Sequence, residues 1–77
     1  MHREVSEMPV TMANVGQTVI INRITGTDDV RQHLAELGFV VGERITVVSN
    51  IGGNVILQVK DARIALDRKM ATRVMVA

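Results

Sequence analysis

The sequence contains no cysteine, no tryptophan and no tyrosine, and it has a single phenylalanine, Phe39. Without cysteine the chain can form neither a disulfide nor a thiolate metal site, which suits a reducing compartment. Proline-rich peptides bind in aromatic-lined grooves, and single-stranded nucleic acid stacks on aromatic rings. Because we expect the one phenylalanine to be buried, both of these binding modes are excluded.

The sequence also lacks the motifs that bring catalytic groups together. It contains no GxSxG nucleophile motif, no phosphate-binding GxxxxGK[ST] loop and no HExxH metal motif. Its two histidines are His2, close to the N-terminus, and His33. We therefore expect a protein that is not an enzyme and that requires no cofactor.

Neither charge nor hydropathy indicates a nucleic acid or a membrane as partner. A formal net charge of +1 gives little attraction to nucleic acid or to anionic lipid. No segment approaches the ~20 apolar residues of a membrane span, and the start, MHREVSEMPV, lacks the apolar run of a secretion signal. We expect a cytoplasmic protein.

The chain has 77 residues, of which 47% are hydrophobic, so it can form one domain with a core of Val, Ile, Leu and Met. We expect a single domain over residues 1–77, in which residues 1–8 are loose. The isolated apolar residues Met12 and Val15 are the first candidates for docking on the core.

Short strands separated by turn residues are predicted over much of the chain. The first, QTVIINRIT, has Ile21 and Ile24 three positions apart, which indicates a β-bulge. Gly52-Gly53 predicts a hairpin turn, because glycine adopts positive φ at no steric cost. The apolar residues of the later strands are Ile45, Val47, Val55, Leu57, Val59, Ile64, Leu66, Val74 and Val76.

One convincing helix is predicted in TDDVRQHLAELG. Thr27 or Asp28 can cap its start, and Gly38 stands where a left-handed residue ends a helix. Val30, Leu34 and Leu37 form one apolar stripe, so we expect them to face the core. A single helical turn fits DRKMAT. Together, about five strands with a helix inserted after the first predict a mainly β, partly open barrel.

The corner after the helix carries a resemblance to a known family. It reads Leu34-x-x-Leu37-Gly38-Phe39-x-x-Gly42-x-x-Ile45-x-Val47, followed later by Gly52-Gly53, Ile64-Ala65-Leu66 and Ala71-x-x-Val74-x-Val76. This order and spacing resembles the FeoA family, bacterial ferrous iron transport protein A, over residues 9–76. Two departures, Val41 and Asn54 at positions where the family often has proline, affect loop stiffness more than fold.

The resemblance implies a fold and a function. It implies an SH3-like barrel whose signature residues here are Leu34, Leu37, Gly38, Phe39, Gly42, Gly52, Gly53, Ala65 and Leu66. It implies a non-enzymatic cytoplasmic accessory protein of ferrous iron transport. The expected partner is the FeoB-type membrane transporter, which carries a cytoplasmic GTPase domain and which the small protein would bind or regulate.

One group of residues is a weak candidate for a metal site. Asp29, His33 and Glu36 are spaced so that all three can lie on one side of the helix. An imidazole with two carboxylates could hold Fe2+ or Zn2+ weakly. The alternative is a solvated acidic face beside the core.

A partner surface is expected on the outward side of the strands. Val48, Ile56 and Met75 fall on the outward phase of their strands and could form an apolar patch. A basic cluster, which could meet an acidic partner, comprises Arg63, Arg68, Lys69 and Arg73. The alternative for the basic cluster is an ordinary solvated face.

Two further function classes stay open. The segment from Val41 to Val47 is similar to the start of RNA-binding barrels of the ribosomal or elongation-factor type, although the near-zero net charge and missing aromatic residues argue against RNA. Iron-dependent repressors carry a similar barrel as a regulatory module, so the chain could instead be a metal-sensing module. No helix-turn-helix precedes it in this sequence.

Overall fold

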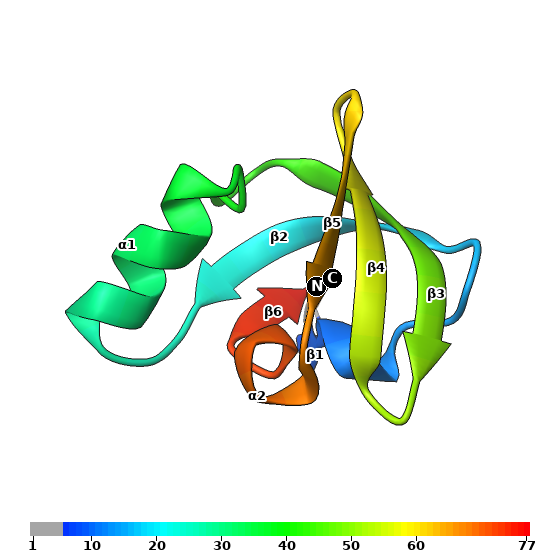
Figure 1. The fold of residues 1–77 in the computed structure, drawn as a ribbon, viewed down its shortest axis with the longest axis horizontal. Helices are drawn as coiled ribbons and strands as arrows, with labels where there is room; N and C mark the ends of the chain where they lie inside the picture. Colours follow the sequence, from blue (N-terminus) through cyan, green and yellow to red (C-terminus); the bar gives the residue numbers. More distant parts are fainter. Residues whose placement is uncertain (1–5) are drawn as a thin grey trace, which may run out of the picture.

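A computed structural model describes residues 6–77, which form one curved antiparallel sheet and two α-helices (Figure 1). Along the chain the elements are β1 (Met8–Pro9), the 3-10 turn η1 (Val10–Met12), β2 (Thr18–Ile24), α1 (Asp28–Glu36), β3 (Arg44–Ile51), β4 (Asn54–Val59), β5 (Ala62–Leu66), α2 (Arg68–Ala71) and β6 (Val74–Val76). The strand order in the sheet is β1-β6-β2-β3-β4-β5.

The sheet curls into a barrel that is not closed. Its two end strands, β1 and β5, are not paired with each other. Instead α2, which follows the C-terminal end of β5, contacts β4, β5 and η1 and so packs between one end of β5 and the start of the described chain (Figure 1). The mainly β architecture and the partly open barrel predicted from the sequence are confirmed.

The N-terminal part of the chain differs from the prediction. Residues 1–5 lie outside the described part, but Met8 and Pro9 pair with β6 and add a sixth strand, so α1 follows the second strand and not the first. Met12 and Val15, the expected docking residues, are 69% and 61% exposed. Val10 and Ala13 are buried instead. A 3-10 helix has three residues per turn, so η1 places these two residues on the same side, towards the core.

The core consists of alternate residues from the strands, one residue each from α1, α2 and η1, and two residues outside these elements, Ala13 after η1 and Phe39 in the corner after α1. The register of β2 against β6 shifts between Ile21 and Arg23, which confirms the predicted bulge. The shift lets Ile21 lie in the core while Ile24 packs at its margin. The buried residues are Val10, Ala13, Val19, Ile21, Leu34, Phe39, Ile45, Val47, Val55, Leu57, Val59, Leu66, Ala71, Val74 and Val76.

The corner after α1 is a Schellman motif. The N–H of Gly38 donates to the carbonyl of Ala35, and the N–H of Phe39 donates to that of Leu34, both at 3.0 Å. Gly38 has φ +107°, which only glycine adopts readily. Leu34 and Phe39 are fully buried. Leu37, predicted to be buried with them, is only half-buried, since it is the C-cap residue and lies past the regular helix.

The hairpin between β3 and β4 is built as predicted. Gly52 and Gly53 have φ values of +61° and +94° and form its two-residue turn. The Asn50 side chain accepts the N–H of Gly53 at 3.1 Å and donates to the carbonyl of Thr11 at 2.9 Å, which ties the turn to η1. A Cβ at position 53 would lie 2.5 Å from Cγ of Arg68, so this glycine also lets α2 approach the hairpin.

Glu7 links the N-terminal segment to β2, and this link predicts a pH dependence. Its carboxylate accepts hydrogen bonds from Nδ2 of Asn22 and, at 2.5 Å, from Nη2 of Arg23. These bonds, the one from Asn22 first, hold the pKa of Glu7 below its ordinary value of 4.5. The carboxylate therefore stabilises the fold above that pH, and the stabilisation is lost as the pH falls through the lowered pKa.

We expect Glu7→Gln to reduce the loss of stability on acidification below about pH 4.5, because the variant has no carboxylate to protonate. Urea unfolding at pH 7 and at pH 3.5 measures the difference for each protein. Glu43→Gln serves as a control, since its ion pair with Lys60 is long, at 3.9 Å. If Glu7→Gln lost as much stability between pH 7 and pH 3.5 as the wild type does, the prediction would be contradicted.

Candidate partner-binding surface

An apolar hollow lies on the outer face of β3, β4 and β5. Its volume is about 350 Å³, and it is lined by Ser49, Ile51, Asn54, Val55, Ile56, Ala65, Leu66 and Asp67. In the sheet Ile56 lies between Ser49 of β3 and Ala65 of β5. Ile51 is 74% exposed and Ile56 is 38% exposed. The hollow therefore presents apolar surface to solvent, as expected of a binding surface.

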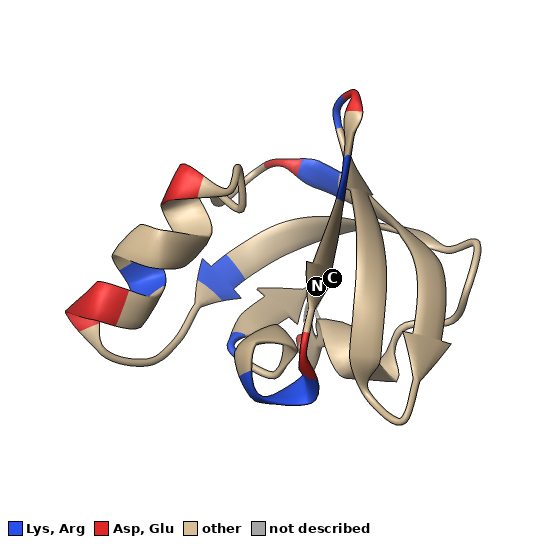
Figure 2. Ribbon diagram, viewed as in Figure 1, with Lys and Arg blue, Asp and Glu red and all other residues tan. Residues whose placement is uncertain are grey.

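Basic residues lie near the lining residues of this hollow along β5 and α2. Arg63 lies on β5, where its Nε donates to Oε1 of Gln58 at 3.1 Å, and Arg68 and Lys69 begin α2 directly after β5 (Figure 2). Among residues 6–77 none of the three basic side chains has a carboxylate within 4 Å. Three of the predicted partner-binding residues, Ile56, Arg63 and Arg68, are thus gathered around β5.

The remaining predicted partner residues lie elsewhere. Val48 sits where the register of β3 against β4 shifts, and it is half-buried. Met75 is half-buried on β6, which β2 and β3 separate from β4 in the sheet. Arg73 lies beside Gly26, next to α1. The structure therefore does not unite Val48, Ile56 and Met75 into one patch. Side chains that point outward from their strands lie together only where those strands are adjacent in the sheet.

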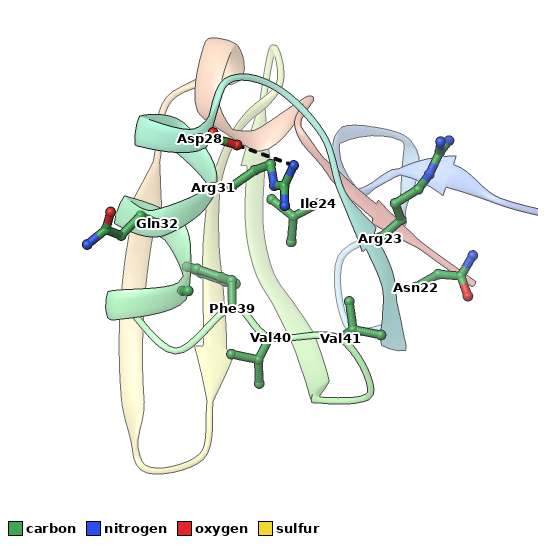
Figure 3. Close-up of a pocket in the computed structure, with 10 residues that line it drawn as sticks. Asn22, Arg23, Ile24, Asp28, Arg31, Gln32, Phe39, Val40 and Val41 are labelled. Carbon is green, nitrogen blue, oxygen red and sulfur yellow. Dashed lines mark ion pairs between the residues drawn. The ribbon is translucent and has the colours of Figure 1, made fainter.

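A second and larger cavity of about 550 Å³ lies between α1, β2 and the corner (Figure 3). Its lining comprises Asn22, Arg23, Ile24, Asp28, Arg31, Gln32, Ala35, Phe39, Val40 and Val41. The two arginines already have carboxylate partners, since Arg31 pairs with Asp28 at 3.6 Å and Arg23 with Glu7. We call this cavity the α1 cleft. Because its two arginines are already paired with carboxylates, it offers little unpaired charge to a partner.

The α1 cleft is not among the surfaces predicted from the sequence. Its exposed apolar residues, Val40 and Val41, follow Phe39 in a loop between Gly38 and Gly42, both of which have positive φ. Phe39 turns into the core, whereas the two valines stay at the surface. Three consecutive apolar residues between two such glycines are a signal that at least one of them is exposed.

The metal candidate is not assembled. Within the part of the chain that the structure describes, no three His, Asp or Glu side chains are grouped so that they could hold a metal ion. Asp29, His33 and Glu36 are all exposed on α1. The first and last are seven residues apart, about 10 Å along a helix axis, so their carboxylates cannot reach one ion. The three side chains are therefore not gathered into one group in the part of the chain that the structure describes.

The comparison with known families decides the identity. A family model described as the FeoA domain matches residues 8–77, which is nearly the whole chain. The chain belongs to the FeoA family. A curated relative from Methanocaldococcus jannaschii, provisionally named Fe(2+) transport protein A, is 32% identical over 68 residues, which are 88% of this chain and 83% of the relative. The resemblance to the FeoA family inferred from the corner motif is therefore confirmed.

Solved structures agree with the fold. The FeoA protein of Stenotrophomonas maltophilia, solved in complex with zinc and called an SH3 domain protein, is 28% identical with a TM-score of 0.79, over 91% of this chain and 89% of that one. A manganese-dependent transcriptional repressor reaches a TM-score of 0.84 at 18% identity, and the match covers 92% of this chain but only 41% of the repressor. The SH3-like fold is thus confirmed, and it is shared with proteins of another function.

The signature residues of the family have structural positions in this FeoA protein. Gly38, Gly42, Gly52 and Gly53 all have positive φ, and Leu34, Phe39 and Leu66 are buried. Ala65 is exposed on β5. Within residues 6–77, no helix combines the length and the apolar character that crossing a membrane requires.

Proposed function

We propose that this FeoA protein is a non-enzymatic accessory protein that binds the cytoplasmic part of a FeoB-type ferrous iron transporter. The observation that carries the proposal is the family match over residues 8–77, together with the relative assigned to Fe(2+) transport. The apolar hollow beside β5 supports the proposal as a docking surface, because it lies near basic side chains that have no ion-pair partner among residues 6–77.

The proposal predicts direct binding. The purified chain titrated into the cytoplasmic GTPase domain and loops of the cognate transporter should give saturable heat or a saturable fluorescence change. A strain that lacks this chain should also take up less ferrous iron than its parent. No interaction in the titration, together with normal iron uptake in the deletion strain, would overturn the proposal.

Ile56→Lys tests whether the hollow is the docking surface. The side chain is on the outer face and 38% exposed, so the fold should tolerate lysine with a change of stability within about 0.5 kcal/mol. An unpaired charge buried at the interface should weaken transporter binding by about tenfold or more. Titration and circular dichroism are measured on the same preparation.

Val41→Lys is the matched control for this prediction. It introduces the same charge at a valine that is 66% exposed and that lies in the α1 cleft, away from β5. Binding by Val41→Lys should equal that of the wild type. Weak binding by Val41→Lys with unchanged binding by Ile56→Lys would move the docking surface to the α1 cleft.

A further inference from the structure

We infer that the free edge of β5 binds an extended, acidic segment of the partner by strand addition, and that the hollow receives an apolar side chain of that segment. The inference rests on the proposed binding to the transporter, since it describes how that partner is held. When a peptide adds a strand to a sheet edge, main-chain hydrogen bonds provide affinity, and pockets for alternate side chains provide specificity.

The edge of β5 offers free backbone groups. β5 is the last strand of the sheet, and within residues 6–77 its outer edge has no paired strand. The turn Lys60–Asp61 closes the hairpin on the pair of Val59 with Ala62. Because hydrogen-bonded and non-hydrogen-bonded pairs alternate along an antiparallel ladder, the N–H and C=O groups of Arg63 and Ala65 point away from β4.

The register places the side chains of an added strand. A residue paired with Ala65 projects to the outer face, beside Ile56 and the hollow, because paired residues share a face of the sheet. A residue paired with Arg63 lies two positions away on the same face, next to the guanidinium. An antiparallel partner would therefore carry an apolar residue followed, two positions later, by an acidic one.

The basic side chains near the edge of β5 indicate which kind of segment binds there. Arg63 lies in the edge strand, and Arg68 and Lys69 follow it after Asp67, whose carboxylate accepts the N–H of Met70. None of the three basic side chains has an ion-pair partner among residues 6–77. Opposite charges across a strand pair stabilise it and like charges destabilise it. A second copy of β5 on this edge would bring a second set of these basic side chains towards the first. The edge of β5 therefore favours an acidic strand over the β5 strand of a second copy of this chain.

The test uses a defined peptide and the full chain. The probe is the heptapeptide STVTETS, acetylated and amidated, whose valine and glutamate match the two edge positions. It is titrated into 15N-labelled protein and followed by NMR. We expect saturable shifts centred on the amides of Arg63 and Ala65. Replacing the glutamate by lysine in the peptide should reduce its affinity about tenfold or more.

N-methylated peptides test the main-chain bonds on the unaltered protein. A methyl group on the valine nitrogen removes a donor that faces β5, so the affinity should fall about tenfold. A methyl group on the next threonine nitrogen, which faces solvent, should change it by no more than about twofold. Equal affinity for the two methylated peptides, or shifts centred on the α1 cleft, would overturn the inference.

Ala65→Pro tests the same edge from the protein side. Proline removes the outward N–H, and edge strands tolerate it where that group does not serve the ladder. The variant should keep a folded amide spectrum and lose peptide binding. Undiminished binding of peptide and of transporter by folded Ala65→Pro would overturn strand addition but leave the proposed function intact. Peptide binding without any transporter binding would keep the edge as a site and refute the transporter as its partner.

Discussion

Replacing Phe39 with alanine should lower the free energy of unfolding by about 3–5 kcal/mol. Phe39 is the only aromatic residue outside the histidines, and its side chain is completely buried behind the α1 cleft. Its removal leaves a void that the small core cannot fill by collapse. For a domain of 77 residues the whole stability is about 4–11 kcal/mol, so much of the variant should be unfolded at 37 °C.

Urea denaturation followed by circular dichroism measures this loss. The control is Val40→Ala, which truncates the neighbouring, exposed side chain and should change stability by no more than about 0.5 kcal/mol. A urea midpoint of Phe39→Ala equal to that of the wild type would show that the ring does not fill the core in solution.

Gly38→Val should cost about 1–3 kcal/mol through backbone strain. Gly38 has φ +107°, a conformation that a β-branched residue rarely adopts. A new Cβ would lie 3.5 Å from Cγ1 of Val59, which is ordinary van der Waals contact. The loss would therefore come from the conformation of the Schellman motif, and steric overlap would contribute little.

The matched control introduces the same side chain three residues earlier. Ala35→Val lies within α1 at an exposed position, so only the lower helix propensity of valine should count, roughly 0.5 kcal/mol. Thermal unfolding of the two variants and the wild type gives the comparison. If both variants lost the same stability, the positive φ of Gly38 would not matter to the fold.

Local patterns in the sequence determined the parts of this protein that depend on near neighbours. Gly38 and the pair Gly52-Gly53 predicted where backbone of positive φ ends a helix and turns a hairpin, and all three positions have it. Alternation predicted the buried faces of β4 and β6. The order of these motifs also indicated the FeoA family. Such features follow from φ preference and side-chain period, which each residue expresses within a few positions of itself.

Tertiary structure alone decided the long-range arrangement. Pro9 pairs with Met75 although 66 positions separate them in the numbering, and neither carries a local signal for that pairing. Ile56 and Met75 share an outward phase, but intervening strands separate them. The candidate surface arises because β5 ends the sheet next to α2 and the hollow. Which residues meet across a sheet depends on strand order, and strand order is set by the packing of the whole core.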